Sequence, residues 1–238
     1  QSEGIVSSLK HFPGHGDTST DSHTKLDTIT KTYEELKSSD LVPFQKLVDA
    51  KADMIMTSHI SFSNITTERF KKGDEEYSYP ATLSSEILND ILRKDMGFEG
   101  VIITDALDMG AITNNFELED ASIRAINAGA NILLMPFTYD YQKDDLKAFV
   151  QSMASKIGTE IDEAKVNDSV RRVLKQKKEK GLFEAYDGSK LESNIAAAKE
   201  VVSNKEVHNE EFEIAKQAIT MIKNESLDRK SGSAGMPR

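Results

Sequence analysis

Titratable side chains are concentrated in one short segment near the start of the chain. Three of the five histidines lie there with a lysine and two aspartates: Lys10, His11, His15, Asp17, Asp21 and His23. Such a density of polar groups around glycine and proline does not suit a core element, because each buried group would need a partner. It is typical of a loop at the end of a strand, where polar side chains face a ligand and glycines let the backbone approach it.

Other reactive side chains follow predicted strands later in the chain. Short apolar runs predict four strands, at residues 5–9, 52–57, 101–104 and 131–135. The first three of these strands lead to Lys10 and His11, to His59, and to Asp105, respectively. In parallel α/β folds, ligands bind at the carboxyl ends of the strands. We therefore expect these side chains to meet in one site.

One chemistry that fits this set is glycoside cleavage. Asp105 would attack a sugar carbon while a group from the opening loop donates a proton, as retaining glycosidases require. No Glu follows any of the predicted strands, so the usual carboxylic acid partner is missing. The segment Asp21-Ser22-His23 offers an alternative donor, because a carboxylate two residues away can orient and stabilise an imidazole.

The competing chemistry is metal-dependent hydrolysis. Its candidate ligands are His11, His15, His59 and Asp105. The spacing of His11 and His15 resembles that of metal ligands, but the intervening proline and glycine prevent the helix that would place both on one face. No His-x-His pair lies on a predicted strand either, so the metal site is the weaker hypothesis and no metal is expected.

Amphipathic runs between the strands predict the helices that position these residues. One is expected from Asp40 to about Ala50, one between Thr82 and Gly97, one from Glu117 to Ala128, and one around residues 146–153. Asp40 is expected to cap the first of them, and residues 61–81 are expected to form an irregular surface loop. Strands that alternate with helices imply parallel βαβ units, which fits both a doubly wound sheet and a (β/α)₈ barrel.

The pattern changes after about residue 160. Residues 162–180 predict one long basic helix whose inward face carries Val166, Val170, Val173 and Leu174. A charged helical stretch follows to about Lys216, and residues 218–222 predict one more strand. The tail at residues 230–238 has the composition of a linker.

Composition excludes several classes of partner. A formal net charge of −10 argues against nucleic acid, because a phosphate backbone would be repelled. The absence of cysteine removes disulfides and thiolate chemistry. No apolar run is long enough to span a bilayer, and no signal-peptide pattern opens the chain, which begins with Gln1.

The opening motif resembles the signature of family 3 glycoside hydrolases of the β-N-acetylglucosaminidase type. The resemblance rests on the run from Lys10 to Thr18 with Asp21-Ser22-His23, and it continues through four further segments. These segments are residues 52–60, 79–84, 97–107 and 128–136. The helix with its Gly181-Leu182-Phe183 end also fits, so the resemblance covers about residues 5–185.

The resemblance implies a role for each site residue. Asp105 matches the nucleophile that forms a covalent glycosyl–enzyme intermediate, His23 matches an unusual histidine acid/base, and Asp21 matches the aspartate paired with it. Lys10 and His11 match residues that bind hydroxyls of the N-acetylglucosamine ring. The implied substrate is a saccharide with terminal β-linked N-acetylglucosamine, typically a peptidoglycan fragment, and no cofactor is implied.

In this family the matching motifs lie on the last four strands of a (β/α)₈ barrel. The resemblance therefore implies an α/β fold, a partial TIM (β/α)₈ barrel made of its last four βα units, followed by helices and the start of a second α/β domain. The expected boundaries are 1–185 for the barrel half, 186–226 for a helical linker with the first elements of the next domain, and 227–238 for a flexible tail. The expected partner is a missing N-terminal half barrel, or a second copy through the open sheet edges.

Two alternatives to a hydrolase remain open in the sequence. Some relatives are phosphorylases, and a histidine suits an anionic attacking group such as phosphate. The chain could also be an inactive half barrel that acts only in folding or association. Localisation is undecided, with a site outside the cytoplasm favoured slightly, because peptidoglycan fragments are processed on both sides of the membrane.

Overall fold

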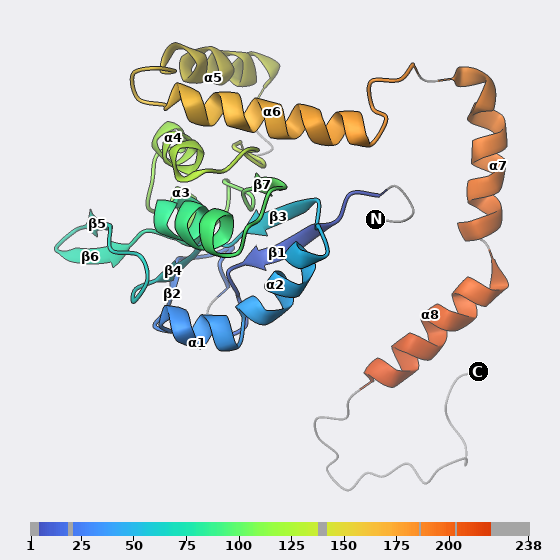
Figure 1. The fold of residues 1–238 in the computed structure, drawn as a ribbon, viewed down its shortest axis with the longest axis horizontal. Helices are drawn as coiled ribbons and strands as arrows, with labels where there is room; N and C mark the ends of the chain where they lie inside the picture. Colours follow the sequence, from blue (N-terminus) through green and yellow to red (C-terminus); the bar gives the residue numbers. More distant parts are fainter. Residues whose placement is uncertain (1–4, 19–20, 138–141, 186, 203, 220–238) are drawn as a thin grey trace, which may run out of the picture. The chain divides into compact units, whose positions relative to one another are not determined.

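The computed structural model describes residues 5–18, 21–137, 142–185, 187–202 and 204–219. The chain divides into two compact units, Gln1–Phe183 and Glu184–Arg238, and each is described here by itself. Figure 1 shows the order of the elements along the chain. Within the described ranges, no helix is both long and apolar enough to cross a membrane.

A parallel sheet forms the centre of the first unit, as the alternating pattern predicts. Its strands are β1 (Ser8–Phe12), β3 (Met54–Thr57) and β7 (Val101–Ile103), in the order β1-β3-β7. The register places Ile55 between Leu9 and Ile102, and both isoleucines are fully buried. Such β-branched side chains suit a sheet that is covered on both faces. The sheet stays open, and no closed barrel is found in the described part of the chain.

The fourth strand does not form as the sequence predicts. Residues 131–135 do not form a regular strand, and only an isolated parallel bridge joins Ile132 to Ile103. The reason lies in Asn131, whose side-chain oxygen accepts a hydrogen bond from the backbone N–H of Ile102 at 2.9 Å. A side chain thus takes the place of a backbone partner, and Met135 at the end of the segment has a positive φ of 41°.

Helices cover the sheet much as the sequence predicts. Four follow the expected runs: α2 (Leu41–Asp49), η2 (Glu86–Asp95), α4 (Leu118–Ala128) and α5 (Lys143–Ser155). The apolar stripes of α2, η2 and α4 join the core, with Phe44 from α2 and Leu88 from η2 among the buried side chains. Helix α5 buries only Met153 and leaves Leu146 and Val150 exposed. One departure is that η2 is a π-helix rather than an α-helix.

The predicted irregular loop at residues 61–81 is ordered, and the prediction is wrong there. It contains most of β4 (Ile60–Phe62), then β5 (Arg69–Lys72), β6 (Glu75–Ser78) and the start of η1 (Ala81–Leu83). The hairpin β5–β6 projects from the first unit (Figure 1). Phe70 stacks on Tyr77 across this hairpin at 5.7 Å, so an aromatic pair orders a segment that looks polar in sequence.

Two further short elements of the first unit were not predicted from the sequence. They are β2 (Asp27–Ile29), which pairs in parallel with β4, and α1 (Tyr33–Ser38). Asp40 precedes α2 but makes no side-chain cap, because its backbone is already helical at φ −63° and ψ −34°. The expected cap at Asp40 is therefore wrong.

Helix α6 (Glu163–Glu179) has the length that the sequence predicts, but its predicted inward face is partly exposed. It forms as one long helix, but Val170 and Leu174 are 51% and 46% exposed rather than turned inward. The short α3 (Gly110–Thr113) follows the segment after β7.

The second unit consists of helices in its described residues. These are η3 (Gly188–Lys190), α7 (Leu191–Val202) and α8 (Lys205–Ala218). The strand expected at residues 218–222 is wrong at Ala218, which ends α8. Ile219 is not part of a strand either, and residues 220–222 and the tail at 227–238 lie outside the described residues.

Candidate active site

Lys10 and His11 lie at an irregularity in β1. The pairing of β1 with β3 shifts register between Leu9 and Phe12, a feature that commonly redirects side chains next to active sites. Phe12 is fully buried and packs edge-on against Phe44 at 5.2 Å, which anchors the end of the strand. Lys10 is exposed and His11 is half-buried, so both lie on the accessible side of this anchor.

Strand β7 leads to Asp105, whose side chain lies next to His11. Its Oδ1 accepts a hydrogen bond from the backbone N–H of Ala106 at 2.8 Å, and its Oδ2 lies 3.5 Å from Nε2 of His11. One carboxylate oxygen is thus held by the backbone while the other faces the histidine. The side chain is 17% exposed, so it is partly shielded from water but still reachable.

His11 is biased towards its neutral form. Burial lowers the pKa of its imidazole, and the nearby Asp105 carboxylate offsets that effect only in part. The charges of Lys10, His15 and His23 lower the pKa further, so these groups lie close enough to act on His11. His11 can therefore offer a neutral hydrogen-bonding ring beside the Asp105 carboxylate near pH 7.

The predicted pair Asp21 and His23 is formed. Nδ1 of His23 lies 2.7 Å from Oδ1 of Asp21, and the same oxygen accepts the backbone N–H of His23 at 2.9 Å. These two hydrogen bonds, the backbone one first, lower the pKa of the Asp21 carboxyl. Because a carboxylate only accepts, Nδ1 carries the proton, and Nε2 is left for proton exchange with a ligand. The His23 side chain is 74% exposed.

The structure also links His23 to the segment that carries Asp105. The backbone carbonyl of His23 accepts a hydrogen bond from the N–H of Gly110 at 3.0 Å, five residues after the aspartate. Lys10, His23 and Asp105 are all close enough for their charges to act on His11, and Asp21 pairs with His23.

His15 supports the opening loop rather than facing a ligand. Its Nε2 lies 3.0 Å from the hydroxyl of the buried Ser22, and its Nδ1 lies 3.0 Å from the hydroxyl of Thr18. The Thr18 hydroxyl donates to the carbonyl of His15 at 2.9 Å, so it accepts from Nδ1. Both ring nitrogens are thereby engaged inside the loop.

A charged brace holds the turn at Gly14. Lys31 pairs with Asp17 and, at 2.6 Å, with Asp40, and these two hydrogen bonds raise the pKa of Lys31 to about 12. Gly14 is buried with a φ of 150°, and a Cβ there would lie 2.7 Å from Oδ1 of Asp40. Only glycine fits this contact, so the aspartate that does not cap α2 instead packs against the loop.

His59 does not join the site, although it follows β3 as expected. It is 1% exposed, with Nε2 donating to the carbonyl of Ala106 at 2.9 Å and Nδ1 at 2.8 Å from the Thr82 hydroxyl. Burial lowers its pKa, so the ring stays neutral and Nδ1 accepts from Thr82. His59 thus supports the backbone next to Asp105. Among the described residues, no group of three or more potential ligands could hold a metal ion.

The sequence did not single out several residues that shape the site. Lys31, Gly110 and Asn114 contact the opening loop, and Thr82 holds the buried His59. Their positions give no local signal, since each acts through a contact more than eight residues away or through a backbone approach. A tertiary contact of this kind is not visible in spacing alone.

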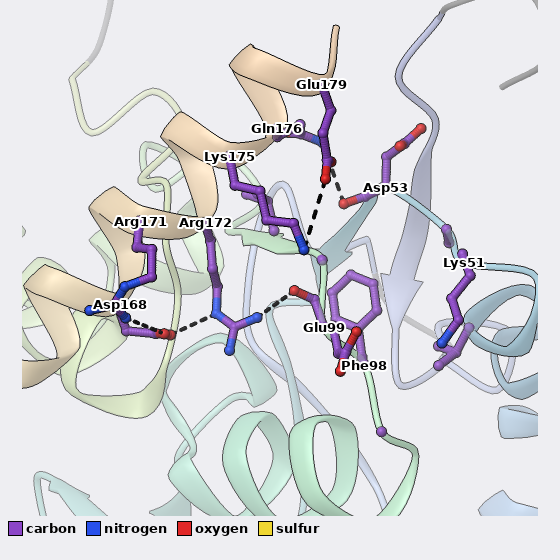
Figure 2. A pocket seen from close by; sticks show the side chains of 15 residues that line it. Lys51, Asp53, Phe98, Glu99, Asp168, Arg171, Arg172, Lys175, Gln176 and Glu179 are labelled. Carbon is purple, nitrogen blue, oxygen red and sulfur yellow. Dashed lines mark hydrogen bonds and ion pairs between the residues drawn. The ribbon is translucent and has the colours of Figure 1, made fainter.

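A pocket lies at the amino ends of β3 and β7, away from Asp105 and His23. Figure 2 shows this pocket of about 460 Å³ between the residues before β3 and β7 and the side of α6. Within α6, Arg172 bonds Asp168 at 2.6 Å, and the same guanidinium donates to the carbonyl of Glu99. Lys180, the residue after α6, lies 3.3 Å from Asp53. The contacts with Glu99 and Asp53 dock α6 against the segments that lead into β7 and β3.

Comparison with known proteins gives consistent matches. The profile of the family described as the glycosyl hydrolase family 3 N terminal domain matches residues 1–176. Beta-hexosaminidase A of Pseudoalteromonas piscicida is 34% identical over 233 residues, which cover 95% of this chain and 38% of that protein.

Solved structures show the same α/β fold. A glycoside hydrolase family 3 beta-N-acetylglucosaminidase from Paenibacillus sp. str. FPU-7 matches 78% of this chain and 33% of its own, with a TM-score of 0.67 and 31% identity. A beta-glucoside phosphorylase matches 78% of this chain and 32% of its own, with a TM-score of 0.67 and 25% identity. The chain thus spans less than two fifths of each of these proteins.

Proposed function

The chain belongs to family 3 of the glycosyl hydrolases, and from that premise we propose that it carries the catalytic groups of a retaining exo-β-N-acetylglucosaminidase. The proposed substrate is terminal β-linked N-acetylglucosamine of peptidoglycan fragments. The observation that carries the proposal is the Asp21–His23 pair at 2.7 Å, joined through Gly110 to the segment of Asp105. Homologues named beta-hexosaminidase and beta-N-acetylglucosaminidase support it.

In the first step Asp105 attacks the anomeric carbon and the glycosidic bond breaks. Nε2 of His23 gives its proton to the departing oxygen, so the aglycone leaves as a neutral alcohol. Asp21 stabilises the imidazolium before this transfer through the bond to Nδ1. The product is a glycosyl ester on Asp105, with His23 now neutral.

In the second step water attacks the anomeric carbon from the opposite side. Nε2 of His23 accepts a proton from that water, the ester bond breaks, and Asp105 leaves as a carboxylate. Two inversions give net retention of configuration. The sugar is held during both steps by Lys10 and His11 of β1, and Nε2 of His11 lies 3.5 Å from Oδ2 of the nucleophile.

A histidine acid/base has a physical advantage in this geometry. A second carboxylate near Asp105 would raise the pKa of one of the two by like-charge repulsion. An imidazole is neutral after it donates its proton, so no second anion faces the nucleophile.

Phosphorolysis is the second candidate function, and the same residue favours it. A phosphate that attacks the glycosyl ester is anionic, and a neutral or cationic His23 repels it less than a carboxylate would. The similarity to a beta-glucoside phosphorylase supports keeping this alternative. Product analysis with and without inorganic phosphate separates the two, since only phosphorolysis yields the sugar 1-phosphate.

We propose further that the four β/α segments are the C-terminal half of a (β/α)₈ barrel. The sheet leaves β1 and the segment at Ile132 without a further described neighbour, and such edges call for pairing. The partner is the N-terminal half of a barrel, from the same polypeptide or through association of a second copy.

The proposed role of His23 is tested by the leaving group. In the complete gene product, His23→Ala should slow substrates with alkyl leaving groups by about 10²–10⁴-fold, the usual worth of acid catalysis. Activated aryl N-acetylglucosaminides, which need little protonation, should lose much less in the first step.

The matched control is His208→Ala. His208 is also exposed and pairs with a carboxylate, Glu211 at 3.2 Å, but it lies on α8 in the other unit. Its removal should leave both substrate classes unchanged. Equal losses on alkyl and activated substrates in His23→Ala would contradict the acid role.

A further inference from the structure

The residues that hold the acid/base segment in place lie on α3 and, in the case of Asn114, directly after it. Resting on the proposed function above, we propose that Asn114 is a positioning residue for His23, acting through the carbonyl of Thr24. Gly110 is its structural counterpart, because its small size lets the two chain segments approach. Neither residue has a side chain that reaches the reacting atoms in this account.

Three consecutive carbonyls of the acid/base segment accept hydrogen bonds from the α3 region. The backbone N–H of Ala111 donates to Ser22 at 3.3 Å, and that of Gly110 donates to His23 at 3.0 Å. The side-chain amide of Asn114 donates to Thr24 at 2.9 Å. The last of these is made by a side chain, so it can be removed without altering the backbone.

Gly110 lies where a larger residue would not fit. A Cβ at this position would lie 2.6 Å from the carbonyl oxygen of Thr24 and 2.8 Å from that of His23. Contacts of this length are not seen for real Cβ atoms, so one of the two segments would have to move. The close approach that puts Asn114 within reach of Thr24 therefore depends on glycine here.

The acid/base segment is a tight turn closed by its own hydrogen bonds. The N–H of Thr24 donates to the carbonyl of Asp21 at 3.0 Å, and the Thr24 hydroxyl donates to the same oxygen at 2.8 Å. A hydrogen bond that fixes the carbonyl of Thr24 therefore also restrains the position of His23, the preceding residue in the turn. The side chains of Asp21 and His23 are exposed, so packing does little to fix them.

The nucleophile and the acid/base are thus both positioned by the segment from Asp105 to Asn114. Asp105 precedes α3 by a short segment, while α3 and the residue after it, Asn114, bind the carbonyls of Ser22, His23 and Thr24. Removing the Asn114 amide should loosen the turn and let Nε2 of His23 drift from the glycosidic oxygen. Asp105 would keep its bond to the N–H of Ala106, so attack on the sugar would be preserved.

Asn115 is a matched control next door. It has the same side chain on the adjoining residue, but its amide donates to Ala111 within its own turn at 2.9 Å. Its oxygen accepts from Lys72 at 2.9 Å, on the β5–β6 hairpin. Asn115 makes no contact with residues 21–25 among its described hydrogen bonds.

The test uses the complete gene product and a series of β-N-acetylglucosaminides with leaving groups from alkyl alcohols to dinitrophenol. In Asn114→Ala, kcat/KM for the poor leaving groups should fall by about tenfold to a hundredfold, the scale of a small misplacement of a catalytic group. For dinitrophenyl substrates it should change by less than about twofold, since no proton is needed. Asn114→Asp, which keeps the shape but loses the donor, should behave like Asn114→Ala, and Asn115→Ala like wild type.

Each other outcome overturns the inference. A uniform loss across the series would make Asn114 a merely structural residue, and no loss would show that the turn holds without it. If wild type is active and labelled at Asp105 while Asn114→Ala shows either result, only the positioning role fails. If wild type cleaves no N-acetylglucosaminide, the proposed function fails and this inference fails with it.

Discussion

Replacing the buried His59 with leucine tests how the backbone beside Asp105 is supported. Leucine fills similar space, so packing is largely kept while two hydrogen bonds are lost. The Thr82 hydroxyl lies 2.9 Å from the carbonyl of Ser58 and can redirect its proton there. The carbonyl of Ala106 loses the bond from Nε2 of His59, at 2.9 Å, and keeps the longer one from the N–H of Met109, at 3.2 Å. Loss of one such hydrogen bond costs about 0.5–1.5 kcal/mol, so we expect a loss of that size in the free energy of unfolding.

The loss should depend on pH with a defined sign. Burial lowers the pKa of His59 below the ordinary value of 6.5, so the folded state favours the neutral ring. Its contribution to stability is fully present above pH 6.5 and declines as the pH falls below that value, by up to about 1.4 kcal/mol per pH unit. The difference in unfolding free energy between wild type and His59→Leu should therefore shrink from pH 7.5 to about pH 5.5.

Urea unfolding at both pH values measures this difference, and Ser61→Ala provides the control. The Ser61 hydroxyl is also buried and donates to a carbonyl, that of Ser78 at 2.6 Å, away from the site. Ser61→Ala should lower the free energy of unfolding by a similar amount at both pH values. It should leave activity unchanged, whereas His59→Leu should reduce it. Equal stability of wild type and His59→Leu at pH 7.5, or a difference that does not change with pH, would refute the reasoning.

Two further predictions concern the opening loop and the nucleophile's neighbour. Gly14→Ala should lower the free energy of unfolding by about 2–4 kcal/mol in urea titrations, because it adds strain at a positive φ to an overlap with Asp40; a loss below about 0.5 kcal/mol would contradict the close contact. NMR titration should give His11 a pKa below 6.5, and Asp105→Asn should lower it further, because the lost carboxylate charge no longer stabilises the imidazolium; a rise in Asp105→Asn would contradict the pairing.

The sequence was sufficient for the features that repeat or cluster. The apolar runs predict the parallel pairing of β1, β3 and β7, because β-branched residues between amphipathic helices have few other arrangements. Residues at the strand ends then meet by topology, which is why Asp105 and His11 lie together as expected.

Features set by single long-range contacts were beyond the sequence. Asn131 breaks the expected fourth strand with its side chain, and nothing in an apolar run signals that a polar end will do so. The hairpin at residues 69–78 looks like a polar loop because its order comes from the stacking of Phe70 and Tyr77. His59 has the position of a site residue in sequence, and only its partners reveal that it faces the interior.

The central claim is that Asp105 forms a covalent bond to the sugar, and trapping that intermediate tests it most directly. The complete gene product is incubated with a 5-fluoro N-acetylglucosaminyl fluoride, digested and analysed by mass spectrometry. The account predicts one sugar adduct, on the peptide that contains Asp105, and no adduct in Asp105→Asn. An adduct on any other peptide, or a sugar product of inverted configuration, would contradict it.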